Sequence, residues 1–139
     1  MHVLTDYIEI STEGHTDIID VTSQVREVLE RSKLRSGQLT VFISGSTAGV
    51  TTIEYEPGLL KDLPEALEKV APIGKRYHHD ATWGDGNGYA HVRAALVGAS
   101  FTVPFENGRL LLGTWQQIVV IDFDNRPRHR KVVVQLIGE

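Results

Sequence analysis

The sequence has no cysteine, which excludes disulfide bonds, thiolate zinc sites and cysteine nucleophiles. It also lacks an excess of positive charge: with 14 Lys and Arg against 18 Asp and Glu, nothing favours a nucleic-acid partner. No apolar run approaches the ~20 residues that a membrane-spanning helix needs. Residues 1–12 lack the basic and then apolar stretches of a signal peptide. We therefore expect a cytoplasmic protein with no membrane or nucleic-acid partner.

What the chain does have is an ordinary globular composition, with 41% apolar and 23% charged residues over 139 positions. That length supports one hydrophobic core and a single domain, residues 1–139. Apolar residues at helical spacing predict helices over residues 21–29 and 59–70, the second with Pro64 inside it. Strand-like segments lie at residues 3–10, 38–44, 50–55, 90–97, 101–105, 109–112, 116–123 and 131–137.

The connections between the later strands are short, and Asn107-Gly108 is typical of a two-residue hairpin turn. Short connections favour antiparallel pairing, because parallel strands need a long crossover. The sequence therefore predicts an α+β fold, with largely antiparallel β-sheets and two main helices.

The segment from Tyr77 to His91, YHHDATWGDGNGYAH, is the most informative part of the chain. It places three histidines, two aspartates and one asparagine around three glycines. Such polar side chains are costly to bury without partners, so packing does not explain them. The glycines allow positive φ and a close approach of backbone to a bound group. We interpret this segment as the functional site.

His79 and His91, with Asp80 or Asp85, form a two-histidine, one-carboxylate set. That set suits a divalent transition metal with open positions for water or substrate. His91 is expected to begin the strand over residues 90–97, and either His78 or His79 could face the site. The alternative is a polar turn in which the aspartates cap backbone amides and the histidines are solvated.

Three other segments carry candidate binding residues. The turn from Ser44 to Thr47 could offer hydroxyls and amides to an anion, or it could be a tight loop that needs small residues. Trp115 and Gln116 could stack on and hydrogen-bond a heteroaromatic ring, although a core or interface tryptophan is more common. The cationic run from 126 to 131 could meet phosphates, but a solvated edge strand is the commoner case.

Three strings identify a family resemblance: FISGSTAGVTTIEYEPG, YHHDATWGDGNGYAHVRAALVGAS and ENGRLLLGTWQQIVVIDFDNRPRHRKVVVQLIGE. Together they resemble the YjbQ family, often labelled secondary thiamine-phosphate synthase. The resemblance extends from about Thr40 to Glu139 and is weaker before that.

The resemblance implies a compact α+β fold that assembles as a homotrimer, with sites between or beside subunits. It implies a polar pocket of His79, Asp85, Asn87 and His91, with the GSTAG and GTWQQ segments nearby, and a small phosphorylated or anionic ligand. In this interpretation His79, Asp85 and His91 are both catalytic residues and ligands of a divalent metal (Zn, Mn or Mg). Substrate would be bound by Ser46, Thr47, Asn87, Trp115, Gln116 and Arg128.

Three functions stay open. A thiamine-phosphate synthase would join hydroxymethylpyrimidine pyrophosphate to a thiazole phosphate and release pyrophosphate. A metal-dependent hydrolase would fit imidazole ligands better, because magnesium prefers oxygen. A non-catalytic trimer would bind a small anion or metal without turnover. The sequence also departs from the family: many relatives have a histidine where this chain has Gly45, and some have one at Gly84.

Overall fold

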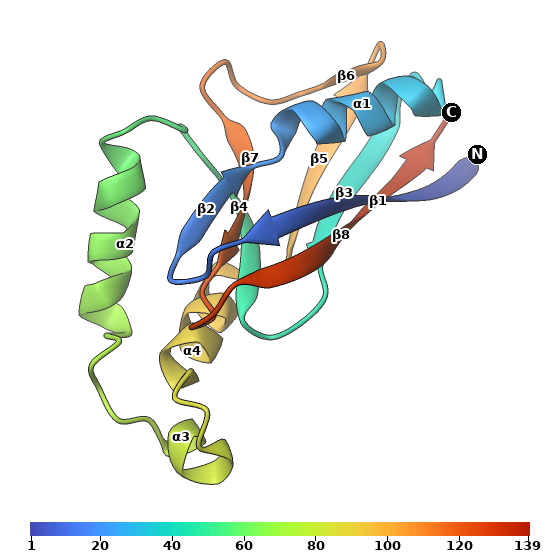
Figure 1. The fold of residues 1–139 in the computed structure, drawn as a ribbon. Helices are drawn as coiled ribbons and strands as arrows, with labels where there is room; N and C mark the ends of the chain where they lie inside the picture. Colours follow the sequence, from blue (N-terminus) through green and yellow to red (C-terminus); the bar gives the residue numbers. More distant parts are fainter.

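The computed structural model describes all residues from 1 to 139, which form eight strands and four helices (Figure 1). None of the helices is long and apolar enough to cross a membrane. The elements, in chain order, are β1 His2–Thr12, β2 Asp17–Asp20, α1 Thr22–Ser32, β3 Gly37–Ile43, β4 Ala48–Ile53, α2 Leu59–Val70, α3 His78–Trp83, α4 Gly88–Val97, β5 Ser100–Glu106, β6 Arg109–Leu110, β7 Gln117–Asp122 and β8 Arg128–Gly138.

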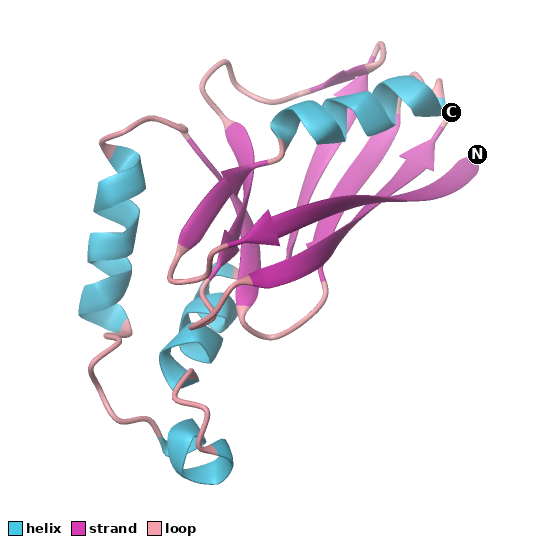
Figure 2. Ribbon diagram, viewed as in Figure 1, coloured by secondary structure: helices cyan, strands magenta, loops and turns pink.

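The strands form two antiparallel sheets, which confirms the predicted α+β class (Figure 2). The larger sheet has the order β1-β8-β3-β5-β6, and the smaller has the order β2-β7-β4. The predicted Asn107-Gly108 turn joins β5 to β6, and both of its residues have positive φ, 53° and 74°. This is the conformation that two-residue hairpin turns require.

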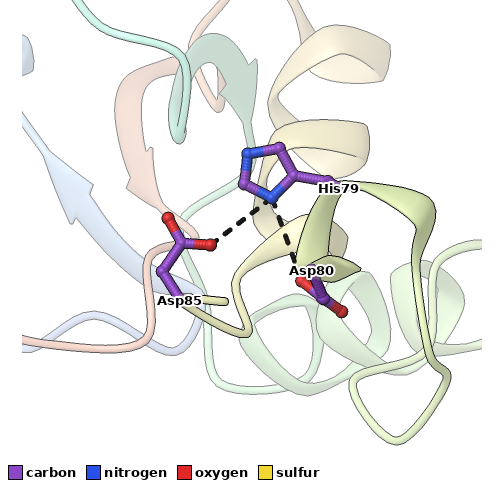
Figure 3. A group of neighbouring side chains, drawn as sticks. All are labelled: His79, Asp80 and Asp85. Atoms are coloured by element: carbon purple, nitrogen blue, oxygen red, sulfur yellow. Dashed lines mark ion pairs between the residues drawn. The ribbon is translucent and has the colours of Figure 1, made fainter. Parts of the chain in front are cut away.

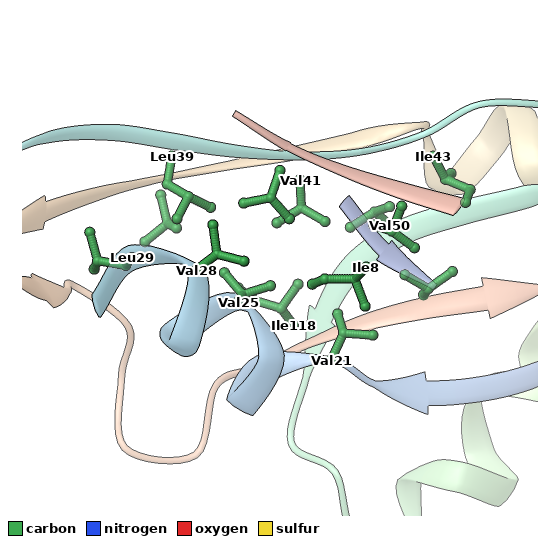
Figure 4. Close-up of a cluster of buried hydrophobic side chains, with 14 of the residues drawn as sticks. Ile8, Val21, Val25, Val28, Leu29, Leu39, Val41, Ile43, Val50 and Ile118 are labelled. Carbon is green, nitrogen blue, oxygen red and sulfur yellow. The ribbon is translucent and has the colours of Figure 1, made fainter. Parts of the chain in front are cut away.

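The first core lies between the two sheets and is closed on one side by α1 (Figure 4). Val25 and Leu29 of α1 are buried because they recur at the spacing of one helical face. In β3 every second residue is buried, including Leu39 and Val41, so one face of the strand meets the core.

The second core lies on the opposite face of the smaller sheet, where α2 and α4 cover it. Alternation along β7 makes this possible: Ile118 faces the first core, whereas Val119 and Ile121 face the second. The strand is therefore buried on both sides, and its sequence is a continuous apolar run. This packing holds α4, and with it His91, against the sheet.

One sequence prediction near the site was wrong, and one helix there was not predicted. Residues 90–97 form most of α4 instead of a strand, so His91 lies in the first turns of a helix. His78 and His79 begin the short helix α3, which was not predicted. The buried face of α4 includes Ala90, Arg93 and Ala94 at helical spacing. The pattern was obscured because a buried arginine occupies a position where an apolar residue would signal a helix.

Candidate functional site

Asp80 organises the polar segment by joining the starts of α3 and α4. Its Oδ2 accepts a hydrogen bond from the Tyr77 amide at 3.1 Å, and its Oδ1 accepts one from the Gly88 amide at 3.0 Å. These two backbone hydrogen bonds, from Gly88 and then Tyr77, lower the pKa of Asp80 below its usual range. Asp80 therefore stays ionised and fixes the loop that carries Asp85 and Asn87.

The centre of the site is the contact between His79 and Asp85 (Figure 3). His79 Nδ1 lies 3.5 Å from Asp85 Oδ1 and 3.9 Å from Asp80 Oδ1. This nitrogen is inaccessible to solvent, yet it has no hydrogen-bond partner. Buried polar atoms are nearly always paired, so an unpaired imidazole nitrogen between two carboxylates calls for a cation or proton. His78 is exposed, which makes His79 the inward-facing histidine of the pair.

Asn87 lies between the carboxylates of Asp85 and Asp124. This part of the site therefore has more hydrogen-bond acceptors than donors. In one orientation its Nδ2 donates to Asp124 Oδ1 at 3.3 Å, and in the reversed orientation it donates to Asp85 at 2.9 and 3.2 Å. One amide nitrogen cannot serve both sides, so one carboxylate always faces the amide oxygen. When that carboxylate is Asp85, a cation shared with Asn87 Oδ1 would relieve the repulsion.

His91 joins the cluster from α4 by stacking on His79. The two ring centroids are 4.2 Å apart and the rings are tilted by 38°. Burial lowers the pKa of His91, as does the charge of His79, whereas Asp85 and Asp124 act in the opposite direction. The ligand atoms that lie within 4.8 Å of one another belong to His79, Asp80 and Asp85. The structure thus brings His91 to the cluster, but its nitrogens are not part of that donor group.

Two of the predicted phosphate-binding residues are engaged in a buried ion-pair network. Thr47 Oγ1 donates to Asp124 at 3.0 Å and accepts from Arg130 Nη2 at 2.8 Å. Arg128 directs Nε and Nη2 at Asp124 Oδ2, at 3.0 and 2.6 Å. Arg130 similarly donates hydrogen bonds from Nε and Nη2 to the two carboxylate oxygens of Asp122, whose side chain is fully buried. These hydroxyl and guanidinium groups already have protein partners, so their first role is to hold the β3–β4 loop and β8 together.

Ser46 is differently placed, because it is exposed on the wall of a cavity that also reaches His91. The cavity has a volume of about 300 Å³ and lies between the β3–β4 loop and α4. Of the predicted substrate-binding residues, Ser46 and Asn87 are therefore the two that lie beside the histidine cluster.

Trp115 and Gln116 lie far from this cluster within one chain. They belong to the loop between β6 and β7, at the end of the molecule opposite α3 (Figure 1). Gln116 Nε2 donates to Thr52 at 3.2 Å, and Trp115 lines a separate cavity with Asp20 and Tyr55. The expected proximity of the GTWQQ segment to the histidine cluster is not met inside a single chain.

Sequence reasoning missed the buried acids of the network, Asp122 and Asp124. The available signal was a pair of carboxylates at and just after the end of the apolar run of β7, in the string VVIDFD. Such acids are almost never fully buried unless they are paired, and two arginines at matching spacing follow at 128 and 130. Two acids before the β7–β8 turn and two arginines after it, each pair two residues apart, could have predicted the network.

Comparisons with known proteins identify the family and agree with the fold. Residues 6–139 match the family described as UPF0047 protein YjbQ-like. A UPF0047 protein of Methanothermobacter thermautotrophicus is 40% identical over 139 residues, covering 100% of this chain and 95% of the relative. The YugU protein of Bacillus subtilis, also of UPF0047, is 35% identical over 94% of this chain and 97% of its own length.

Solved structures of related proteins have the same fold. A YbjQ-like protein of unknown function from Sulfolobus solfataricus superposes with a TM-score of 0.94, at 30% identity and 99% coverage of both chains. A hypothetical protein from Aeropyrum pernix has a TM-score of 0.91, at 33% identity, covering 98% of this chain and 99% of its own. The fold and site thus define an α+β domain with a histidine–carboxylate cluster. The chain belongs to the YjbQ-like UPF0047 family.

Proposed function

We propose that His79 and Asp85 bind a divalent metal ion and that the protein is a metal-dependent enzyme. The observation that carries this proposal is the buried, unpaired Nδ1 of His79, which faces the carboxylates of Asp85 and Asp80. Asn87 Oδ1 would be a neutral oxygen donor beside these groups, and a metal ion there would account for an amide buried between two acids. Nitrogen and oxygen donors together suit Zn²⁺ or Mn²⁺.

The first candidate activity is thiamine-phosphate synthase, as a secondary activity of this site. The reaction joins hydroxymethylpyrimidine pyrophosphate to a thiazole phosphate and releases pyrophosphate. A divalent cation would supply charge neutralisation for the departing pyrophosphate. The contribution of this chain would be to orient the substrates beside His91 and to keep water from one side of the cluster through the packing of α4.

A second candidate, hydrolysis, is favoured by the donor set itself. Magnesium sites that serve pyrophosphate departure use mainly oxygen ligands, whereas this cluster includes imidazole. A zinc or manganese ion would supply an activated water at neutral pH. His91 lies next to His79 and has a lowered pKa, so it can hold a neutral imidazole that accepts a proton.

One experiment compares the two activities at the same site. Metal-free protein is reconstituted with Mg²⁺, Mn²⁺ or Zn²⁺ and assayed with both thiamine precursors and with a panel of phosphate esters. We expect turnover in at least one assay, dependent on added metal and lost in His79→Ala but kept in His78→Ala, which alters an exposed neighbour. Turnover that is independent of metal, or equal in both variants, would contradict the proposal.

A further inference from the structure

The buried amide of Asn87 has two alternative hydrogen-bond partners on opposite sides. In one orientation its Nδ2 lies 3.3 Å from Asp124 Oδ1. In the reversed orientation Nδ2 lies 2.9 and 3.2 Å from the two carboxylate oxygens of Asp85. Only the nitrogen of an amide donates, so a half-turn about the Cβ–Cγ bond exchanges one partner for the other. The orientation therefore depends on which carboxylate gains more from the donor.

Asp124 is well supplied with donors without Asn87. Arg128, the Thr47 hydroxyl and the Asn125 amide donate hydrogen bonds of 2.6–3.0 Å to its carboxylate. Arg128 also brings a positive charge, so the charge of Asp124 is largely neutralised. An amide oxygen that faces Asp124 therefore meets a carboxylate whose hydrogen bonds are already made, and the repulsion between the two is small.

Asp85 is in the opposite situation, because Asn87 is the residue that can donate to its carboxylate. His79 Nδ1 lies 3.5 Å away and makes no hydrogen bond (Figure 3). Asn125 binds the backbone oxygen of Asp85 and leaves the carboxylate free. Without a cation, the Asn87 donor therefore contributes more at Asp85 than at Asp124. With a cation on Asp85, the preference reverses, since the amide oxygen is then attracted to that side.

We propose that Asn87 is a metal-responsive switch, which donates to Asp85 in the metal-free protein and to Asp124 when a divalent ion is bound at His79 and Asp85. This inference concerns the regulation of the proposed site and so rests on the proposed function. The reversal passes a hydrogen-bond donor to Asp124, which also accepts from Thr47 of the β3–β4 loop. That loop borders the cavity that reaches His91, so metal occupancy is linked to the cavity wall.

Neutron diffraction from deuterated crystals tests the switch directly, because deuterium atoms on Nδ2 distinguish the amide nitrogen from the oxygen. In the metal-free protein we expect Nδ2 to face Asp85. In crystals equilibrated with Zn²⁺ we expect Nδ2 to face Asp124 and Oδ1 to face the ion. If zinc is bound and Asn87 has the same orientation in both forms, the switch is wrong and the metal proposal stands.

Two variants test the competition between the carboxylates without any metal. In metal-free Asp85→Ala one acceptor is gone, so Asn87 should turn its Nδ2 to Asp124. Asp62→Ala, which removes an exposed acid of α2, is the matched control and should keep the orientation of the metal-free wild type. The same orientation in both variants would overturn the switch. Wild-type crystals that take up no zinc would contradict the metal proposal and remove the trigger, so the two failures are distinguishable.

Discussion

At the scale of single residues, Asp124 is the buried acid that links the residues around the site through its hydrogen bonds. Burial raises its pKa, but hydrogen bonds from Arg128, the Asn125 amide, Asn87 and Thr47 outweigh this and hold the pKa at about 2, below the ordinary 3.8. The folded state thus favours the ionised form. The stabilisation that results is fully present above pH 3.8 and is lost as the pH falls towards 2.

Asp124→Asn should therefore make the free energy of unfolding depend less steeply on pH below pH 3.8. We expect a loss of about 3 kcal/mol at pH 7, because the Arg128 ion pair is broken. The difference from wild type should shrink as the pH falls from 3.8 towards 2. Chemical denaturation at a series of pH values measures both. An acid slope as steep in the Asp124→Asn variant as in wild type would show that other carboxyls, such as Asp122, account for the acid sensitivity.

His91 allows binding and catalysis to be separated. It stacks on His79 but contributes no nitrogen to the close donor group. We expect His91→Gln to keep most of the metal affinity and to lower turnover by roughly 10²–10⁴-fold, the usual effect of removing an acid/base group. Steady-state kinetics and metal titration of the same variant measure the two quantities. Loss of metal together with activity would make His91 a ligand instead.

At the scale of elements, the sequence predicted what depends on local patterns. Apart from β2, the strands of both sheets follow from their β-forming composition or alternation, α1 and α2 follow from helical spacing, and the β5–β6 turn follows from Asn-Gly. α4 was missed because Ala and Val fit either structure, and because its buried face contains Arg93. That side chain is 1% exposed, since it donates to Ala71 O, Thr16 and Glu68. These hydrogen bonds offset the cost of burying the Arg93 guanidinium, and they depend on tertiary contacts that a local sequence pattern does not show.

Gly49 tests how closely α4 must pack on the small sheet. A Cβ at this position would lie 2.8 Å from Val97 Cγ1 and 2.9 Å from the Gly98 carbonyl oxygen. Gly49→Ala should therefore shift the end of α4 and cost about 1–3 kcal/mol of stability, the usual cost of overpacking. Thermal unfolding measures this cost. A variant with unchanged stability would show that α4 can move without penalty.

At the scale of the whole molecule, the site was only partly predictable. His79, Asp85 and Asn87 lie within nine residues, so their proximity follows from one short segment. The network of Thr47 with Arg130 joins residues 83 positions apart, and its formation depends on the pairing of whole strands. Distance along the chain also separates Trp115 from the histidines: the family resemblance implied that they lie close together, but the β6–β7 loop that carries Trp115 lies at the other end of the molecule (Figure 1).

The expected homotrimer would reconcile that separation, because a neighbouring copy can bring its β6–β7 loop to the histidine cluster. Trp83 beside the cluster and Trp115 in that loop are 74% and 71% exposed, which is typical of side chains that a partner covers. We expect a mass of about 46 kDa, three times 15.4 kDa, by light scattering after size exclusion. Trp115→Ala should shift the distribution towards smaller species. A monomeric wild type would contradict the expectation.

Whether His79 and Asp85 hold a metal is decided by the metal content of untagged protein purified without chelators, measured by elemental mass spectrometry. We predict about one zinc or manganese ion per chain in the wild type and in His78→Ala, and close to none in His79→Ala or Asp85→Asn. If wild-type protein holds no divalent metal after reconstitution and dialysis, or if His79→Ala holds as much as wild type, the His79–Asp85 cluster is not a metal site.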